Sequence, residues 1–204
     1  MDITEKVSLG TTTVAFRFRD GVLICADSRT SSDTRIVNRV SRKLAKLTDR
    51  IVIAVSGSLA DTKFLHRTVQ RLVYDHELAL GRPCAVRTAA GLFSLFNHTY
   101  KSVLQAGILV GGHDADGYHC FKVGLGGTVT EAENVMSGSG STYIMGMMDS
   151  DYRVGMTEEE AVAFAKKLVR HAALRDGSSG GVIRWVILKD GAIHGDIGDY
   201  EQLL

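Results

Sequence analysis

The sequence predicts an α+β fold in which antiparallel sheets are covered by helices. Apolar strand-like runs are joined by tight turn signals, as at 19–21 and 190–191. The elements run in the order strands, two helices, strands, helices, strands, without the long crossovers that a parallel sheet needs. We therefore expect antiparallel sheets that carry helices on their outer faces.

The first half of the chain is expected to contain a hairpin, a buried strand and two helices. The strands are expected at 11–18, 21–27 and 51–55, with a polar link between the second and the third. Ser58 can cap the first helix, with Asp61 three residues later. Pro83 interrupts the chain before a second helix over 86–104.

The second half is expected to return to strands around two more helices. The strands are expected at 107–112, 118–123, 127–136, 182–189 and 192–195. The glycine-rich run 137–141 is too flexible for the interior of an element and should lead into a short helix. Thr157 and Glu160 form a capping box that opens a long helix through Leu174.

Composition narrows the class of protein. With 204 residues, 45% apolar and 23% charged, the chain suits one soluble domain. A net charge of +1 gives no electrostatic argument for nucleic acid or an acidic membrane as a partner. No apolar run approaches the roughly 20 residues of a membrane span, and residues 1–10 lack the apolar centre of a secretory signal. Cys25, Cys84 and Cys120 are an odd number and widely spaced, which favours reduced core thiols in an intracellular compartment.

Gly10 and Thr11 form a candidate self-cleavage site. A threonine hydroxyl can attack the carbonyl behind it when glycine leaves the approach open, and the shift that follows frees an α-amine on Thr11. That amine, with an ordinary pKa of about 7.7 to 8.0, can serve as the base for the hydroxyl. Residues 1–10 would then be a pro-segment and 11–204 a single mature domain.

The same stretch also has a plainer interpretation. Val14, Phe16 and Phe18 alternate with other residues, which is typical of a half-buried strand. Gly-Thr is a common dipeptide. The catalytic hypothesis therefore depends on the rest of the chain.

Short motifs in a fixed order supply that support. They are Gly10–Thr12, Ala26–Thr30, Lys43, Ser56–Ser58, Ser137–Ser141 and Arg175–Arg184. Together they resemble a β-type subunit of the 20S proteasome, from Gly10 to about residue 195. Among eukaryotic β types the chain is most similar to type 1, the caspase-like class, through Asn38–Val40, Ala60–Thr62 and Tyr152–Thr157.

The resemblance implies an N-terminal nucleophile hydrolase fold of four αββα layers, with two antiparallel sheets between helix layers. It implies threonine-type hydrolysis of unfolded polypeptides, within stacked seven-membered rings built with other α and β subunits. Cytoplasm and nucleus are the compartments expected of such a particle. The mechanism requires no cofactor.

The resemblance also assigns catalytic roles residue by residue. Thr11 matches the nucleophile, and Lys43 matches a lysine whose charge lowers the pKa of the Thr11 amine. Asp27 matches the aspartate that pairs with Lys43 and orients it. Gly57 matches the residue whose backbone N–H stabilises the oxyanion, and its position before a helix suits that role. Residues that hold the amine and relay protons are matched by Ser139, Asp176 and Ser179.

Two other kinds of site are not expected. The run 137–141 lacks the lysine and the strand–loop–helix context of a phosphate-binding loop. The histidines, aspartates and cysteine within 113–120 fit no standard zinc or calcium spacing, so we expect a polar hairpin tip and no metal there.

The substrate pocket departs from the class in one respect. By position it would be lined by Thr30, Ser31, Ser41, Val55, Leu59 and Lys63. Val55 stands where the class has an arginine that neutralises an acidic P1 side chain. Lys63, one helical turn beyond Leu59, is expected to reach the pocket and keep an acidic preference. If it points to solvent, the pocket should prefer small apolar P1 residues.

A non-catalytic role is the alternative. Some β types only build the ring, after losing the threonine or keeping the pro-segment. This chain has Thr11, Asp27, Lys43 and Gly57, which favours an active subunit.

Overall fold

Residues 10–32, 35–194 and 200–203 are described by the computed structural model, in which two antiparallel sheets are accompanied by helices. The first sheet contains β10 (Asn134–Ser137), β1 (Thr13–Phe18), β2 (Gly21–Ala26), β11 (Val182–Lys189) and β12 (Ala192–His194) in that order, with β13 (Glu201–Gln202) paired to β11. The second contains β5 (Leu44–Lys46), β6 (Ile51–Gly57), β7 (Ala106–Asp114), β8 (Gly117–Val123) and β9 (Val129–Glu131). A separate hairpin joins β3 (Thr30–Ser32) and β4 (Arg35–Asn38).

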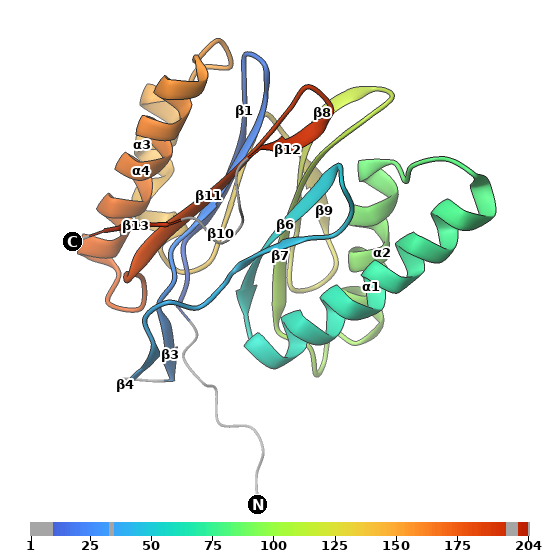
Figure 1. Cartoon of the computed structure of the whole chain (residues 1–204). Coiled ribbons are helices and arrows are strands. Elements are labelled where there is room, and N and C mark those ends of the chain that lie inside the picture. The colour runs from blue at the N-terminus through green and yellow to red at the C-terminus, as the bar shows by residue number, and fades with distance from the viewer. Residues whose placement is uncertain (1–9, 33–34, 195–199, 204) are drawn as a thin grey trace, which may run out of the picture.

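The two sheets face each other between two pairs of helices, as Figure 1 shows. Helices α3 (Ser141–Asp151) and α4 (Glu158–Arg175) lie beside the first sheet, and α1 (Leu59–Leu80) and α2 (Val86–Thr99) lie beside the second. The prediction of an α+β fold with antiparallel sheets is confirmed. Within the described residues no helix is long and apolar enough to cross a membrane.

Alternation along the strands places side chains in three core clusters. In β1, Val14 and Phe16 pack toward α3 and α4, whereas Ala15 packs between the two sheets. In β6, Ile53 packs toward α1 and α2, whereas Val52 faces the first sheet. The stretch predicted as a half-buried strand is therefore buried on both faces, because a helix layer covers one face and a sheet covers the other.

The expected strand over 127–136 is wrong as a single element. β9 pairs with β8 in the second sheet, whereas β10 pairs with β1 in the first, so the chain changes sheets at Ala132 and Glu133. The backbone N–H of Arg17 donates to the Glu133 carbonyl at 2.8 Å, which anchors the crossing. No local sequence pattern predicts this change of sheet, because it depends on the pairing of β10 with β1, which lies far away in the sequence.

Other boundaries are close to those expected. The two helix caps are confirmed: the Ser58 side chain accepts from the Asp61 N–H, and Thr157 and Glu160 form a reciprocal capping box. The second helix ends at Thr99 rather than 104. The β3–β4 hairpin was expected only as a polar link, because its second strand is exposed at every position. Residues 1–9 of the predicted pro-segment, and Gly195 at the end of the last predicted strand, lie outside the described residues.

The three cysteines are free and buried, as the sequence predicted for core thiols. Cys25 and Cys120 are fully covered, and burial raises the pKa of both thiols. They therefore stay protonated and act as small apolar side chains in the core.

A glycine sets the distance between the two sheets. A Cβ atom on Gly111 in β7 would lie 2.5 Å from Ile24 Cδ1 and 3.1 Å from Val22 Cγ1 of the opposite sheet. Gly91, on the exposed face of α2, would meet nothing within 4 Å. These two glycines therefore form a matched pair for a test of packing.

We predict that Gly111→Ala lowers the free energy of unfolding by about 1–3 kcal/mol through overpacking. Gly91→Ala should raise it by about 0.5–1 kcal/mol, because glycine weakens a helix interior. Thermal unfolding of the purified chains measures both, since 1 kcal/mol shifts the Tm of a chain of this size by about 2–4 °C. Equal effects of the two substitutions would contradict a tight contact between the sheets at Gly111.

Candidate active site

Thr11 lies immediately before β1, where three segments meet. In the antiparallel register Thr13 is opposite both Ala26 of β2 and Ser137 of β10. The start of β1 is therefore beside the ends of β2 and β10. The residues that follow those two strands, including Asp27 and Ser139, are brought to Thr11 in this way.

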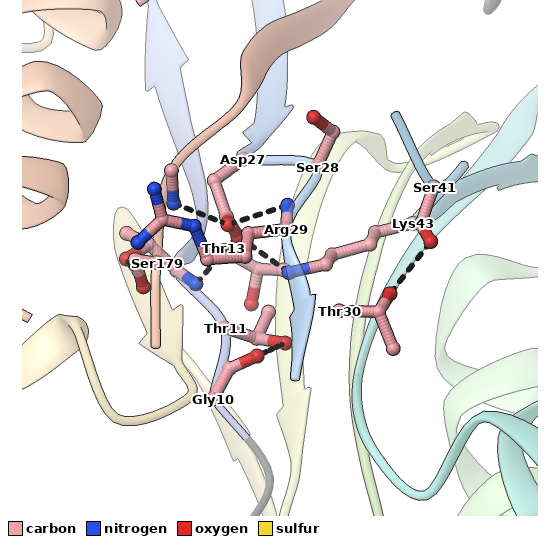
Figure 2. Close-up of polar contacts among 12 residues, drawn as sticks. Gly10, Thr11, Thr13, Asp27, Ser28, Arg29, Thr30, Ser41, Lys43 and Ser179 are labelled. Atoms are coloured by element: carbon pink, nitrogen blue, oxygen red, sulfur yellow. Dashed lines mark hydrogen bonds and ion pairs between the residues drawn. The ribbon is translucent and has the colours of Figure 1, made fainter. Parts of the chain in front are cut away.

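The Thr11 hydroxyl lies against the peptide bond that precedes it. Its Oγ1 donates to the Gly10 carbonyl oxygen at 2.5 Å, and the side chain of Thr11 is buried. Figure 2 shows this contact beside the Lys43 ammonium. A Cβ atom on Gly10 would overlap the side chain of Ser178, so packing admits only glycine at that position. The arrangement places a nucleophile next to the carbonyl that it would attack.

Asp27 is a buried carboxylate saturated by donors. Its Oδ1 accepts from the Thr12 N–H at 2.9 Å and from Lys43 Nζ at 2.7 Å. Its Oδ2 accepts from the N–H groups of Arg29, at 3.1 Å, and Gly180, at 2.9 Å. These four hydrogen bonds fix the carboxylate in orientation (Figure 2).

Lys43 immediately precedes β5, and its side chain extends into this buried region. Its side chain is only 6% exposed and ends on Asp27. Burial lowers the pKa of Lys43, because removal from water disfavours the charged ammonium, while the neighbouring Asp27 acts in the opposite direction. A lysine with a lowered pKa can give up a proton more readily than a solvated one.

A second polar chain holds the Thr11 nitrogen. The Thr11 N–H donates to Ser139 Oγ at 3.3 Å, and Ser139 Oγ donates to Asp176 Oδ2 at 2.6 Å. Ser179 Oγ donates to the same carboxylate oxygen at 2.6 Å. All three residues that sequence reasoning placed around the Thr11 nitrogen are therefore linked to it or to one another.

Gly57 ends β6 just before the Ser58 cap of α1. Its φ of +98° is a left-handed conformation that favours glycine, and a Cβ atom there would overlap the Gln105 carbonyl oxygen. Gly57 borders Thr11 in two separate hollows. It is therefore placed where a backbone donor can face a reacting carbonyl.

The first hollow beside Thr11 matches most of the predicted substrate pocket. Its lining includes Gly10, Thr30, Ser31, Val55, Leu59 and Thr62. Ser41 lies behind it, where its hydroxyl shares a 2.6 Å hydrogen bond with Thr30 Oγ1. Lys43 is the charged side chain among the described lining residues, and it is already paired with Asp27.

The structure places Lys63 outside this pocket. Lys63 is exposed, whereas Thr62 is 1% exposed and takes the lining position. At the start of α1, Thr62 is one of the buried positions of the helix, whereas Lys63 is exposed. The ammonium of Lys63, which was expected to pair with an acidic P1 side chain, is therefore absent from the part of the pocket wall that the structure describes.

The sequence did not predict the roles of two further residues in this hydrogen-bond network, Thr12 and Gly180. Thr12 Oγ1 shares a 2.8 Å hydrogen bond with Ser179 Oγ, and the Gly180 N–H reaches Asp27. Thr12 reads as an ordinary strand residue and Gly180 as a turn residue. Their adjacency to Thr11 and Ser179 was the only available signal.

The polar hairpin tip within 113–120 is held by hydrogen bonds of His119. His119 contacts Asp114 Oδ1 at 3.1 Å and Glu131 Oε1 at 2.7 Å. In the part of the chain that the structure describes, no group of three or more such side chains is arranged to hold a metal ion.

Comparison with known proteins assigns the family. A family model described as proteasome subunit matches residues 7–188. A probable proteasome subunit beta type-1 of Schizosaccharomyces pombe is 43% identical over 188 residues, covering 91% of this chain and 83% of the relative. The proteasome subunit beta type-1 of Saccharomyces cerevisiae is 40% identical over 202 residues, covering 97% and 94%. The proteasome subunit beta type-6 of Arabidopsis thaliana is 38% identical over 189 residues, covering 92% and 81%. The chain therefore belongs to the proteasome subunit family, as a β-type subunit of type 1.

Proposed function

We propose that this chain is a threonine-type endopeptidase subunit that frees its own nucleophile by cleaving after Gly10. The observation that carries the proposal is the position of Thr11 Oγ1, 2.5 Å from the Gly10 carbonyl oxygen. The bond between Thr11 N and Ser139 adds support, because it holds the nitrogen that would leave. The proposal includes the four-layer N-terminal nucleophile hydrolase assignment of this domain.

The self-cleavage has a balanced course. Thr11 Oγ1 attacks the Gly10 carbonyl carbon as its proton passes to the nearby network, and the carbon–nitrogen bond then breaks as that network returns a proton to the Thr11 nitrogen. This leaves an ester between Gly10 and Thr11 Oγ1, together with a free Thr11 amine. Water hydrolyses the ester, residues 1–10 depart with a carboxylate, and the hydroxyl is restored.

In the mature subunit the Thr11 amine would take the proton from its own hydroxyl. The Lys43 charge favours the neutral form of that amine, and Asp27 keeps Lys43 oriented. The Gly57 N–H would face the oxyanion. We propose unfolded polypeptides as the substrate, rings with other α and β proteasome subunits as the assembly, and cytoplasm and nucleus as the location.

Self-cleavage is tested by the mass of this chain in the assembled particle. We predict that the wild-type chain begins at Thr11, and that Thr11→Ala retains residues 1–10 because the attacking hydroxyl is gone. Thr11→Ser is the matched control, because it keeps a hydroxyl and should still be cleaved. A Thr11→Ala chain trimmed like the wild type would reject self-cleavage. A wild-type chain that retains residues 1–10 would instead favour a non-catalytic ring subunit.

The lysine is tested by peptide hydrolysis. Lys43→Ala should lower the activity of this subunit by about 10²-fold or more, because the charge beside the amine is lost and Asp27 loses its partner. Lys43→Arg should also fail, since a guanidinium fork does not fit a buried single contact of 2.7 Å. Lys46→Ala, at an exposed lysine at the end of β5, is the control and should retain activity. Near-normal activity of Lys43→Ala would make this lysine structural.

The pocket predicts a preference for small apolar P1 residues. Val55, Leu59 and Thr62 offer no free cation, and burial of an unpaired P1 carboxylate costs several kcal/mol. In a panel of fluorogenic peptides we expect Leu and Val to exceed Asp by at least tenfold in kcat/KM, with no effect of Lys63→Ala. Val55→Arg should raise cleavage after Asp. Strong cleavage after Asp that falls tenfold in Lys63→Ala would show that Lys63 reaches the pocket in solution, and strong cleavage after Arg would contradict both versions.

A further inference from the structure

A second hollow borders Thr11 and is distinct from the P1 pocket. Both hollows share Thr11 and Gly57, but Gly10 lines only the first and Ser139 lines only the second. The second is formed where β7, β8 and the loop after β10 meet, and it also includes Lys122 and Leu125.

The chemistry of Thr11 indicates which hollow lies on the acyl side of the scissile bond and which lies on the leaving side. In self-cleavage Gly10 supplies the acyl group, so the first hollow lies on the acyl side. The leaving group is the Thr11 nitrogen, which donates to Ser139 on the wall of the second hollow. When a separate peptide is cleaved, its leaving amine must take a proton from the Thr11 amine and must therefore approach the same nitrogen. The second hollow accordingly lies on the leaving side of the scissile bond.

Small residues make the floor of this hollow. A Cβ atom on Gly107 would lie 2.5 Å from Ser56 Oγ and 2.9 Å from Ser137 Oγ, so the packing of these two serines favours glycine at this position. Leu125 is 56% exposed at the rim and offers an apolar contact. The floor of the second hollow therefore discriminates little between peptide side chains. Any selectivity depends on the side chains at the edge of the hollow.

Lys122 is the charged side chain of the second hollow among its described lining residues. Lys122 is paired with Leu109 of the neighbouring strand β7, and it follows Cys120 by two positions in β8. Leu109 and Cys120 both pack between the two sheets. Lys122 therefore belongs to the same face, at the strand end where the core gives way to the hollow. It is exposed, and none of the ion pairs among the described residues includes it.

We propose that the second hollow binds the leaving half of the substrate and that Lys122 selects a carboxylate there. The inference rests on the proposed peptidase function. The carboxylate is either an Asp or Glu side chain in the first two residues after the scissile bond or the terminal carboxylate of a short peptide. Lys122 acts on specificity rather than on the bond-breaking step.

The test uses internally quenched peptides with one acyl half ending in Leu and a varied leaving half. Gln is replaced by Glu at the first or second leaving residue, and short peptides are compared as free acids and as amides. Each rate is taken as the difference between a particle with wild-type Thr11 and an otherwise identical Thr11→Ala particle. We expect a carboxylate to raise kcat/KM by about two- to fivefold, the range of an exposed ion pair, and the gain to shrink at high salt.

Substitutions at Lys122 identify the source of the preference. Lys122→Gln should abolish the gain, Lys122→Arg should keep it, and Lys46→Gln should not alter it. A gain from a Glu side chain identifies an acidic residue as the ligand, whereas a gain confined to free acids identifies the chain terminus. No gain in either series, or a gain unchanged by Lys122→Gln, would overturn the proposal.

A peptidyl aminocoumarin separates this inference from the proposed function, because it has no residue after the scissile bond. Lys122→Gln should cleave it at the wild-type rate. A wild-type subunit with no Thr11-dependent cleavage of this substrate would reject the peptidase function itself. Normal cleavage without any carboxylate preference would reject only the role of Lys122.

Discussion

The buried ion pair between Asp27 and Lys43 is the constraint on which the site depends. Two charges removed from water are tolerated only when attraction and hydrogen bonds replace their hydration. Here the carboxylate receives N–H groups from Thr12, Arg29 and Gly180, which precede β1, follow β2 and precede β11. The compensation of one charge pair therefore fixes three separate segments of the chain around Thr11.

Burial and the Asp27 carboxylate have opposite effects on the pKa of Lys43, and this links the packing around the ion pair to the proposed chemistry. Burial lowers its pKa, whereas Asp27 raises it, and burial is the larger effect. Without the Asp27 carboxylate, burial would be opposed less strongly, and Lys43 would lose its proton at a lower pH. A neutral lysine would no longer bias the Thr11 amine toward its neutral form. In the proposed mechanism Asp27 would thus act on the Thr11 amine through Lys43, although its own bonds go to backbone donors and the ammonium.

The sequence predicted the parts of the molecule that are encoded locally. Turn residues located the hairpins, where Asp190 and Gly191 both take positive φ, and Thr157 located the start of α4. The change of sheet between β9 and β10 is decided by distant pairing, and no local pattern contains it. The same division between local and distant information applies to the site. The resemblance predicted residues such as Lys43 from motifs in the sequence. Whether residue 62 or residue 63 faces the pocket depends on how α1 packs, which the motifs do not contain.

Other segments of the chain approach Thr11 and Thr12 closely, and this accounts for two of the glycines in the nearby motif. A Cβ atom on Gly138, which has a φ of +88°, would overlap the Thr11 carbonyl, and one on Gly140 would overlap Thr12 Oγ1. Close approach of the backbone leaves few side-chain rotamers to adjust, so the position of the Thr11 hydroxyl is set by the fold. Val55 lines the first hollow, and none of the hydrogen bonds that join Thr11, Asp27 and Lys43 to their partners involves its side chain. Under the proposed function, a substitution at Val55 would therefore change which peptide is accepted without disturbing the groups that would cleave it.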